Sequence, residues 1–176
     1  MGNELFTRYG TADLDDFKPS MVNIEDIAHS LARQCRFNGH VQDFYSVAQH
    51  SILVSYACPD ELALEGLLHD AHEAYTGDII RPVKRQLFDV NILEAEIQAV
   101  IHHKYGIMNS YRPEVKKADD LILKLELRTF FGSRKLIAAY GYEAATARFM
   151  ERFREICRGV DKDREQQIFE IRESMR

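Results

Sequence analysis

The sequence has no tryptophan and contains only three cysteines, four prolines and nine glycines among its 176 residues. Cys35, Cys58 and Cys157 are odd in number and form no Cys-x-x-Cys pair, which argues against a disulfide framework and against a thiolate metal site. The scarcity of proline and glycine excludes a fibrous or low-complexity chain. We therefore expect one globular domain with free thiols, in a reducing compartment.

The chain also lacks an excess of positive charge and any long apolar run. Its formal net charge is -5, so we expect no stable binding to nucleic acid, which needs a basic surface to displace counterions. No run approaches the roughly 18 apolar residues of a membrane span, and residues 1–10 have no apolar core of signal-peptide length. These absences predict a cytoplasmic protein without a membrane partner. A small anionic substrate is compatible, because a local pocket of lysine and arginine can hold phosphate.

Apolar residues recur at helical spacing along most of the chain, and no segment shows the alternation of a β-strand. We predict an all-α helical bundle, built as a single domain over residues 1–176. Residues 1–22 are predicted to form an N-terminal loop or arm, and residues 160–176 a peripheral helix. Asn23 is the expected cap of the first helix, and further helices are expected at about 44–57, 59–77, 92–105, 114–131 and 143–157. Residues 133–142 fit either a helix or a loop.

Four side chains of metal-binding type lie in these predicted helices: His50, the adjacent His69 and Asp70, and Asp119. Imidazole nitrogens and carboxylate oxygens both ligate divalent metals. Antiparallel helices joined by a short turn could bring His50 to the His69–Asp70 pair, and Asp119 comes from a later helix. Each residue alone is more often a packing or surface residue, so the hypothesis depends on the combination. This mixed set favours an open Mn, Fe, Co, Ni or Zn site over a structural zinc site.

Two more carboxylates follow the His–Asp pair. Glu73 lies four residues after His69, on the same helix face, where it could orient or deprotonate a water or fix a ligand. Asp78 follows Gly77 and could contact a sugar hydroxyl or assist a leaving oxygen. Both are candidate catalytic residues.

Basic residues surround these acids in the sequence and could neutralise the charge of a transferred phosphoryl group. They are Arg36, Arg81, Lys84 and Lys116. Phe37, beside Arg36, could pack on a base or a sugar, although such a residue more often belongs to the core. The remaining histidines, which include His72 and the pair His102–His103, are assigned to the surface or to packing.

The pattern H…HD…D resembles the HD-domain superfamily of metal phosphohydrolases. The segments that carry the resemblance are residues 36–37 (RF), 47–51 (VAQHS), 68–78 (LHDAHEAYTGD), 82–84 (PVK) and 116–119 (KKAD). They are similar to the bacterial YfbR-like 5′-deoxynucleotidases, and residues 36–40 also resemble the phage DatZ-like dATP triphosphohydrolases. The resemblance covers about residues 24 to 130 and implies a compact HD-domain bundle.

The resemblance implies His50, His69, Asp70 and Asp119 as metal ligands and Glu73 as the catalytic acid or base. It implies Arg36, Asp78 and Lys84 as substrate contacts, and Lys116 as a contact to a longer phosphate chain. The cofactor would be a divalent transition metal, with a second ion such as Mg²⁺ accompanying the phosphates. A homo-oligomer, either a dimer or a trimer of dimers, in a bacterial or phage-infected cytoplasm is the expected context.

The leading hypothesis for function is hydrolysis of a dNTP, of the dATP type, to deoxynucleoside and triphosphate. The alternative is a 5′-deoxynucleotide monophosphatase that releases inorganic phosphate. Two further readings are a non-catalytic nucleotide-binding regulator and a cyclic-nucleotide phosphodiesterase. The regulator predicts loss of a ligand or of Glu73, and the sequence retains all of them.

Overall fold

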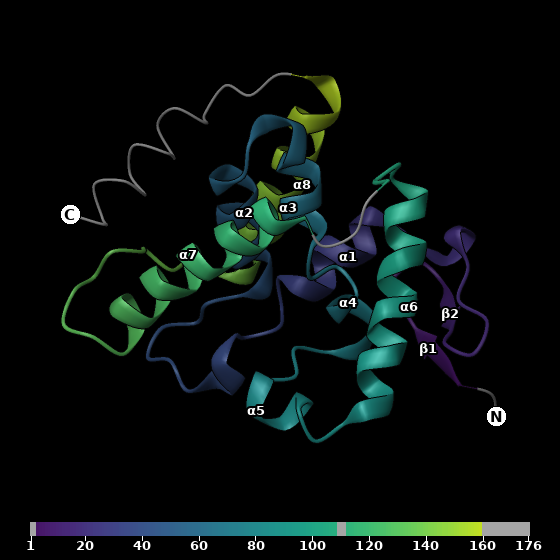
Figure 1. The fold of residues 1–176 in the computed structure, drawn as a ribbon, viewed down its shortest axis with the longest axis horizontal. Helices are drawn as coiled ribbons and strands as arrows, with labels where there is room; N and C mark the ends of the chain where they lie inside the picture. Colours follow the sequence, from purple (N-terminus) through teal and green to yellow (C-terminus); the bar gives the residue numbers. More distant parts are fainter. Residues whose placement is uncertain (1–2, 109–111, 160–176) are drawn as a thin grey trace.

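Helices make up most of residues 3–108 and 112–159, which the computed structural model describes (Figure 1). They are α1 (Ile24–Leu31), α2 (Val47–Ala57), α3 (Ala63–Leu68), α4 (Glu73–Thr76), α5 (Arg81–Lys84), α6 (Phe88–Lys104), α7 (Pro113–Phe130) and α8 (Tyr142–Arg158). Short 3-10 helices lie at Pro19–Met21, Phe37–Gly39 and Asp60–Leu62. The all-α prediction is confirmed, and the helix predicted at 160–176 falls outside the described residues. No helix in the described part of the chain combines the length and the apolar character needed to cross a membrane.

The helix boundaries follow from local capping chemistry. The Asn23 side chain accepts a hydrogen bond from the backbone N–H of Glu25 and opens α1, as the sequence predicts. Ser46 does the same for Gln49, so α2 begins at Val47 and not near residue 44. Gly77 follows α4 with a φ of 87°, in the left-handed region that only glycine adopts at low cost.

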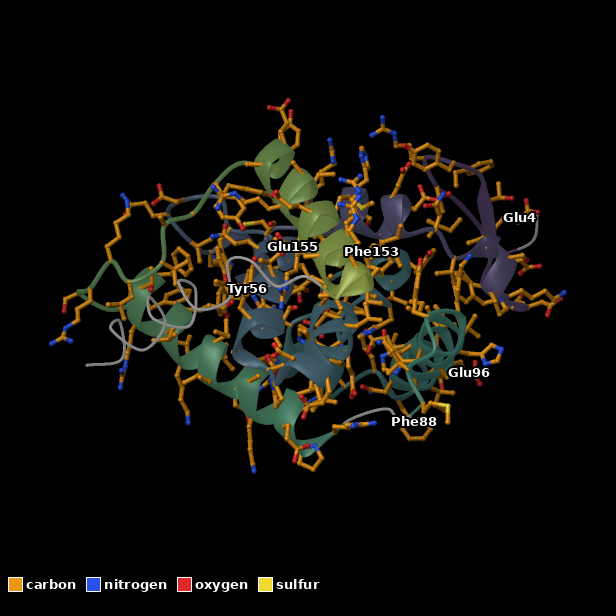
Figure 2. All side chains as sticks on the ribbon, turned by 90° about the horizontal axis from the view of Figure 1, so that it is seen from above. Glu4, Tyr56, Phe88, Glu96, Phe153 and Glu155 are labelled. Carbon is orange, nitrogen blue, oxygen red and sulfur yellow. The ribbon has the colours of Figure 1, made fainter. Side chains whose placement is uncertain are left out.

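The core forms around α2, which packs against α3, α7 and α8. α2 is buried on nearly every face, which explains why its sequence is apolar all round rather than on one stripe. α8 packs against both α2 and α3 and runs over them in the view of Figure 2. Its Phe149 is fully buried together with Leu67 of α3 and Leu125 of α7. α1 packs against α8 and α4. The central position of α2 places His50 inside the protein.

The N-terminal segment, predicted as a loop or arm, contains a short hairpin that the sequence does not predict. Strands β1 (Glu4–Phe6) and β2 (Thr11–Asp13) pair in an antiparallel hairpin, with Leu5 opposite Ala12. Ala12 is completely buried and ties the hairpin to the core. Strands of three residues are too short for their alternation to be recognised in the sequence.

The single helix predicted for residues 59–77 is wrong, because the chain breaks between α3 and α4 at residues 69–72. The Gln98 side chain of α6 causes the break. Its amide nitrogen donates to the Leu68 carbonyl at 2.7 Å, and its amide oxygen accepts from the His72 backbone N–H at 3.1 Å. These two backbone groups would bond to each other in a continuous helix. The insertion puts His69 and Asp70 on a turn.

Two other differences concern proline and helix length. The sequence predicts no helix at residues 81–84, where the structure has α5; Pro82 sits in the first turn of this helix, where its missing N–H has no helical partner. α6 begins at Phe88, four residues before the predicted start, without a side-chain cap.

A glycine allows α2 and α3 to approach closely. A Cβ atom on Gly66 would lie 2.7 Å from Cys58 Sγ and 3.1 Å from the Ser55 Cα. A glycine is therefore required where α3 crosses α2, and this crossing sets the position of His69 relative to His50.

Gly66→Ala is expected to lower the free energy of unfolding by about 1–3 kcal/mol, because the added methyl group overpacks the α2–α3 contact. Urea denaturation monitored by circular dichroism measures the change. Gly10→Ala is the matched control, since a Cβ at Gly10 meets no atom within 4 Å. Equal stabilities for the two variants would contradict the close-approach explanation.

Candidate metal centre

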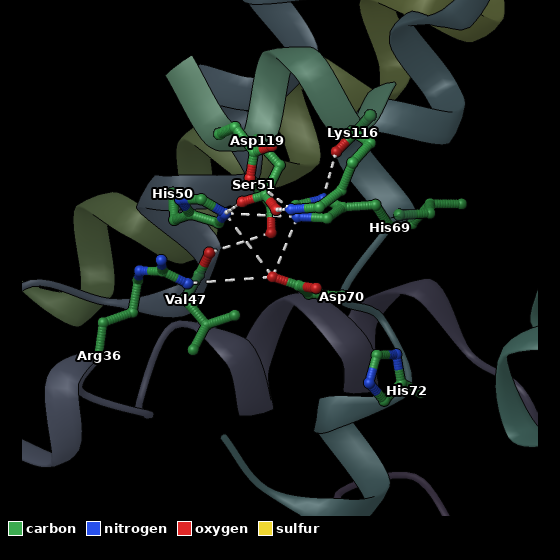
Figure 3. A network of polar contacts seen from close by, with 12 residues as sticks. Arg36, Val47, His50, Ser51, His69, Asp70, His72, Lys116 and Asp119 are labelled. Carbon is green, nitrogen blue, oxygen red and sulfur yellow. Dashed lines mark hydrogen bonds and ion pairs between the residues drawn. The ribbon is translucent and has the colours of Figure 1, made fainter. Parts of the chain in front are cut away.

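The four residues predicted as metal ligands come together at one point (Figure 3). His50 projects from α2, His69 and Asp70 from the turn after α3, and Asp119 from α7. His50 Nε2 lies 3.3 Å from His69 Nε2 and 3.3 Å from Asp119 Oδ1. Asp70 Oδ2 lies 3.0 Å from His69 Nε2 and 3.7 Å from His50 Nε2. Residues far apart in the sequence thus form one cluster.

Both histidines present Nε2 to the cluster because Nδ1 is already engaged. His50 Nδ1 lies 2.6 Å from Glu126 Oε1, and His69 Nδ1 lies 2.8 Å from the Gly66 carbonyl oxygen. Each acceptor requires a proton on Nδ1, which leaves the Nε2 lone pair available to a metal. This arrangement fixes the ring orientation and raises the basicity of the ligand, as is usual for metal-binding histidines.

The ligand atoms of His50, His69 and Asp119 all lie within 4.8 Å of one another, so this group could hold a metal ion. Ligands about 2.1 Å from a zinc ion are about 3.4 Å apart across a tetrahedral angle, close to the separations in this cluster. Burial and Arg36 act to lower the pKa of His50, but Glu126 and Asp119 outweigh them and raise it to about 9. The same negative surroundings favour a metal cation at Nε2.

Glu126 is the residue of this site that the sequence analysis missed. Its carboxylate is completely buried and accepts hydrogen bonds from His50, from the Tyr45 hydroxyl at 2.8 Å and from Arg36 Nη2 at 2.9 Å. Burial opposes ionisation, but His50 and Arg36 lower the pKa of Glu126 to about 2. The spacing in the sequence could have indicated Glu126 as a candidate, because it follows Asp119 by two helical turns and therefore lies on the same face of α7.

Arg36 is directed at the cluster (Figure 3), and its side chain is mostly buried. Besides its bond to Glu126, its Nη1 lies 3.9 Å from Asp70 Oδ2. The Phe37 ring lies 5.4 Å from the Arg36 guanidinium carbon and packs on Phe130 and Phe131, with ring centroids 6.4 and 5.3 Å apart. Phe37 has a φ of 57°, a left-handed conformation that costs a bulky residue about 1–2 kcal/mol. Such strain is characteristic of functional loops.

The two candidate catalytic carboxylates lie beside Arg36 and Asp70. Burial is the main cause that raises the pKa of Glu73 well above its usual value, and the negative charges of Asp70 and Asp78 raise it further. Burial also raises the pKa of Asp78, whose backbone N–H donates to Gln34 Oε1 at 2.7 Å. The surroundings of Glu73 therefore favour a protonated carboxyl group that can donate a hydrogen bond.

The other predicted phosphate contacts are engaged by carboxylates. Arg81 Nη2 and Lys116 Nζ lie 3.2 and 2.7 Å from Oδ2 of Asp119, the oxygen that does not face His50. Lys84 Nζ lies 2.8 Å from Glu94 Oε2. Arg81 and Lys116 are more than half exposed. They orient Asp119 and can move toward a ligand, because their side chains are long and in contact with water.

Glu126→Gln is expected to weaken metal binding by about 10–100-fold, because an amide is a poorer acceptor for the His50 Nδ1–H. Titration with Co²⁺ against a competing chelator measures the affinity. Glu114→Gln, an exposed change on the same helix, should leave it unaltered. Unchanged Co²⁺ affinity in a folded Glu126→Gln protein would contradict this role.

Comparison with known proteins relates the chain to two bacterial proteins, while no family model matches it. It is 47% identical over 114 residues to the uncharacterized protein YfdR of Escherichia coli, a match that covers 65% of this chain and 64% of that protein. The chain thus spans less than two thirds of the length of this relative. It is 37% identical over 134 residues to the uncharacterized protein RCAP_rcc00048 of Rhodobacter capsulatus, with 68% of each chain covered. The chain belongs to the same protein family as this Rhodobacter capsulatus protein.

Proposed function

We propose that the chain is a metal-dependent phosphohydrolase that acts on deoxynucleotides, with a dNTP as the leading candidate substrate. One observation carries the proposal: two histidines with engaged Nδ1 atoms direct Nε2 at a point shared with Asp70 and Asp119. On an ion that accepts more than four ligands, such as Mn²⁺ or Co²⁺, two nitrogens and two carboxylate oxygens would leave coordination positions open for water and phosphate.

A divalent ion held by these residues supplies Lewis-acid activation of the phosphoryl group and of water. The protein residues around it supply the rest of the chemistry. Arg36 is held beside Asp70 by Glu126, in a position to neutralise charge on a nonbridging phosphate oxygen. Burial and neighbouring carboxylates raise the pKa of Glu73, so its carboxyl group would give a proton to the leaving oxygen as the P–O bond breaks, and the carboxylate so formed would take up the proton that the attacking water loses. Asp78 lies close enough to Glu73 for its negative charge to raise the pKa of Glu73.

The ion pairs of Asp119 help to decide between a triphosphate and a monophosphate substrate. A triphosphate would draw Arg81 and Lys116 away from Asp119, and both side chains have the exposure to move. A monophosphate needs only Arg36 and the metal, so 5′-deoxynucleotide monophosphatase activity is the second candidate. It is favoured by the observation that Arg81, Lys84 and Lys116 already have carboxylate partners.

A nucleotide panel with Mn²⁺, Co²⁺, Zn²⁺ and Mg²⁺ tests the proposal through its products. Triphosphate released from dATP identifies the leading reaction, and inorganic phosphate released from dAMP identifies the second. Asp70→Ala should abolish either product. Product formation at the wild-type rate by a folded Asp70→Ala protein, or no product from any deoxynucleotide with any of these metals, would contradict the proposal.

Glu73→Gln is expected to lower kcat by about 10²–10⁴-fold, because the amide cannot transfer the proton that the carboxyl group donates. Steady-state kinetics with the best substrate of the panel gives kcat, and metal analysis of the same sample serves as its control. The account predicts full metal content with lost turnover. Retained turnover would remove Glu73 from the reaction.

A further inference from the structure

A cavity lies directly against the candidate metal centre. It has a volume of about 260 Å³ and is enclosed by the turn at residues 69–72, by α6 and by the first turns of α7. His69, Asp70 and Asp119 line one of its sides, so it opens onto the cluster. Arg36, Phe37 and Asp78 are not among its lining residues. The cavity thus extends from the metal ligands in a different direction from the Arg36 side.

The charges that line the cavity are already balanced. Each lining lysine or arginine is paired with a lining carboxylate, and the pairs are Lys84–Glu94 at 2.8 Å, Lys116–Asp119 at 2.7 Å and Arg112–Glu65 at 3.6 Å. A phosphate group placed here would meet four carboxylates, counting Asp70. The cavity therefore suits an uncharged polar group rather than a phosphate.

Gln98 fixes the protonation of two histidines in the cavity wall. Its oxygen must face the His72 backbone N–H and its nitrogen must face the Leu68 carbonyl, which determines the orientation of the amide. The same oxygen lies 3.1 Å from His72 Nδ1, so this nitrogen carries the proton. The Gln98 nitrogen also lies 2.6 Å from His102 Nε2, which must accept. His72 Nε2 is therefore left as a hydrogen-bond acceptor.

Glu94 provides a second acceptor in the same wall. Its Oε2 is shared between Lys84 and, at 3.8 Å, His72 Nε2, whereas its Oε1 is buried and has no hydrogen-bond partner among the described residues. The whole residue is only 6% exposed. A buried carboxylate oxygen without a donor is costly, and such a group commonly marks the place of a ligand. Figure 3 shows the His72 ring set apart from the metal ligands.

We propose that this cavity binds the base of the nucleotide and selects bases with an exocyclic amino group. An amino group has two hydrogens and can donate one to Glu94 Oε1 and one to His72 Nε2, whereas a hydroxyl has only one to donate. The volume lies just below the roughly 300–1,000 Å³ of pockets for drug-sized ligands, which fits one heterocycle and not a whole nucleotide. This inference rests on the proposed function, because it assigns the base of that substrate.

The test compares deoxyadenosine, which has an amino group at C6, with deoxyinosine, which has an oxo group at C6 and a hydrogen on N1. Isothermal titration of the wild-type protein with each nucleoside needs neither phosphate nor catalysis. Deoxyadenosine should bind at least about tenfold more tightly, because deoxyinosine has one donor, its N1–H, for two acceptors, and its oxo group faces a carboxylate. Equal affinities, or displacement of deoxyadenosine by inorganic triphosphate from the same site, would overturn the proposal.

Glu94→Gln converts one acceptor into a group that can also donate, so the preference should shrink or reverse toward deoxyinosine. Glu96→Gln, an exposed change on the same helix (Figure 2), should keep it. If Glu94→Gln does not fold, Glu94→Asp withdraws the acceptor and should weaken deoxyadenosine binding alone. A preference that survives both Glu94 changes would contradict the assignment.

Hydrolysis is measured separately, so that the two proposals can fail independently. If the protein hydrolyses deoxynucleotides but binds deoxyadenosine and deoxyinosine equally well, the proposal of a base-binding cavity is wrong and the phosphohydrolase proposal stands. If it prefers deoxyadenosine but hydrolyses no deoxynucleotide, the cavity proposal is supported and the catalytic proposal is wrong.

Discussion

The buried contact between His50 and Glu126 is the interaction on which the site depends. At 2.6 Å, with both side chains fully buried, it fixes the imidazole ring so that Nε2 faces His69 and Asp119. The same carboxylate holds the Tyr45 hydroxyl and the Arg36 guanidinium. A buried carboxylate must be paired to be tolerated in the core, and here three donors on different segments pair with it. One charge thereby links α7, α2 and the loop that carries Arg36.

A second constraint concerns the place where α3 ends. The Gln98 amide replaces the hydrogen bond between the Leu68 carbonyl and the His72 N–H. His69 and Asp70 therefore lie on a tighter turn, in which the Ala71 N–H donates to the Leu68 carbonyl and the Glu73 N–H to the Asp70 carbonyl. Gly66 contributes on the other side, since it lets α3 approach α2 and its carbonyl orients His69. The cavity beside the metal ligands exists because of the same turn.

The sequence predicts the features that depend on neighbouring residues. The Asn23 cap follows from the residue type at the start of a helix, and the approach of His50 to the His69–Asp70 pair follows from the packing of consecutive antiparallel helices. Glu126 shares the α7 face of Asp119, but that spacing does not predict its contact with His50, because its burial depends on Tyr45 and Arg36, which are distant in sequence. The break at residues 69–72 depends in the same way on Gln98, which lies on α6. Lys116 and Arg81 were predicted as phosphate contacts from charge alone, and their pairing with Asp119 required the fold.

Whether a cation binds among His50, His69 and Asp119 is the question on which the account depends. Anomalous X-ray scattering at the cobalt or zinc edge, from crystals grown with that metal, answers it directly. The account predicts one dominant anomalous peak within about 2.0–2.2 Å of His50 Nε2, His69 Nε2 and an Asp119 oxygen. A crystal containing the metal at other positions, with no peak among these three side chains, would contradict the central claim.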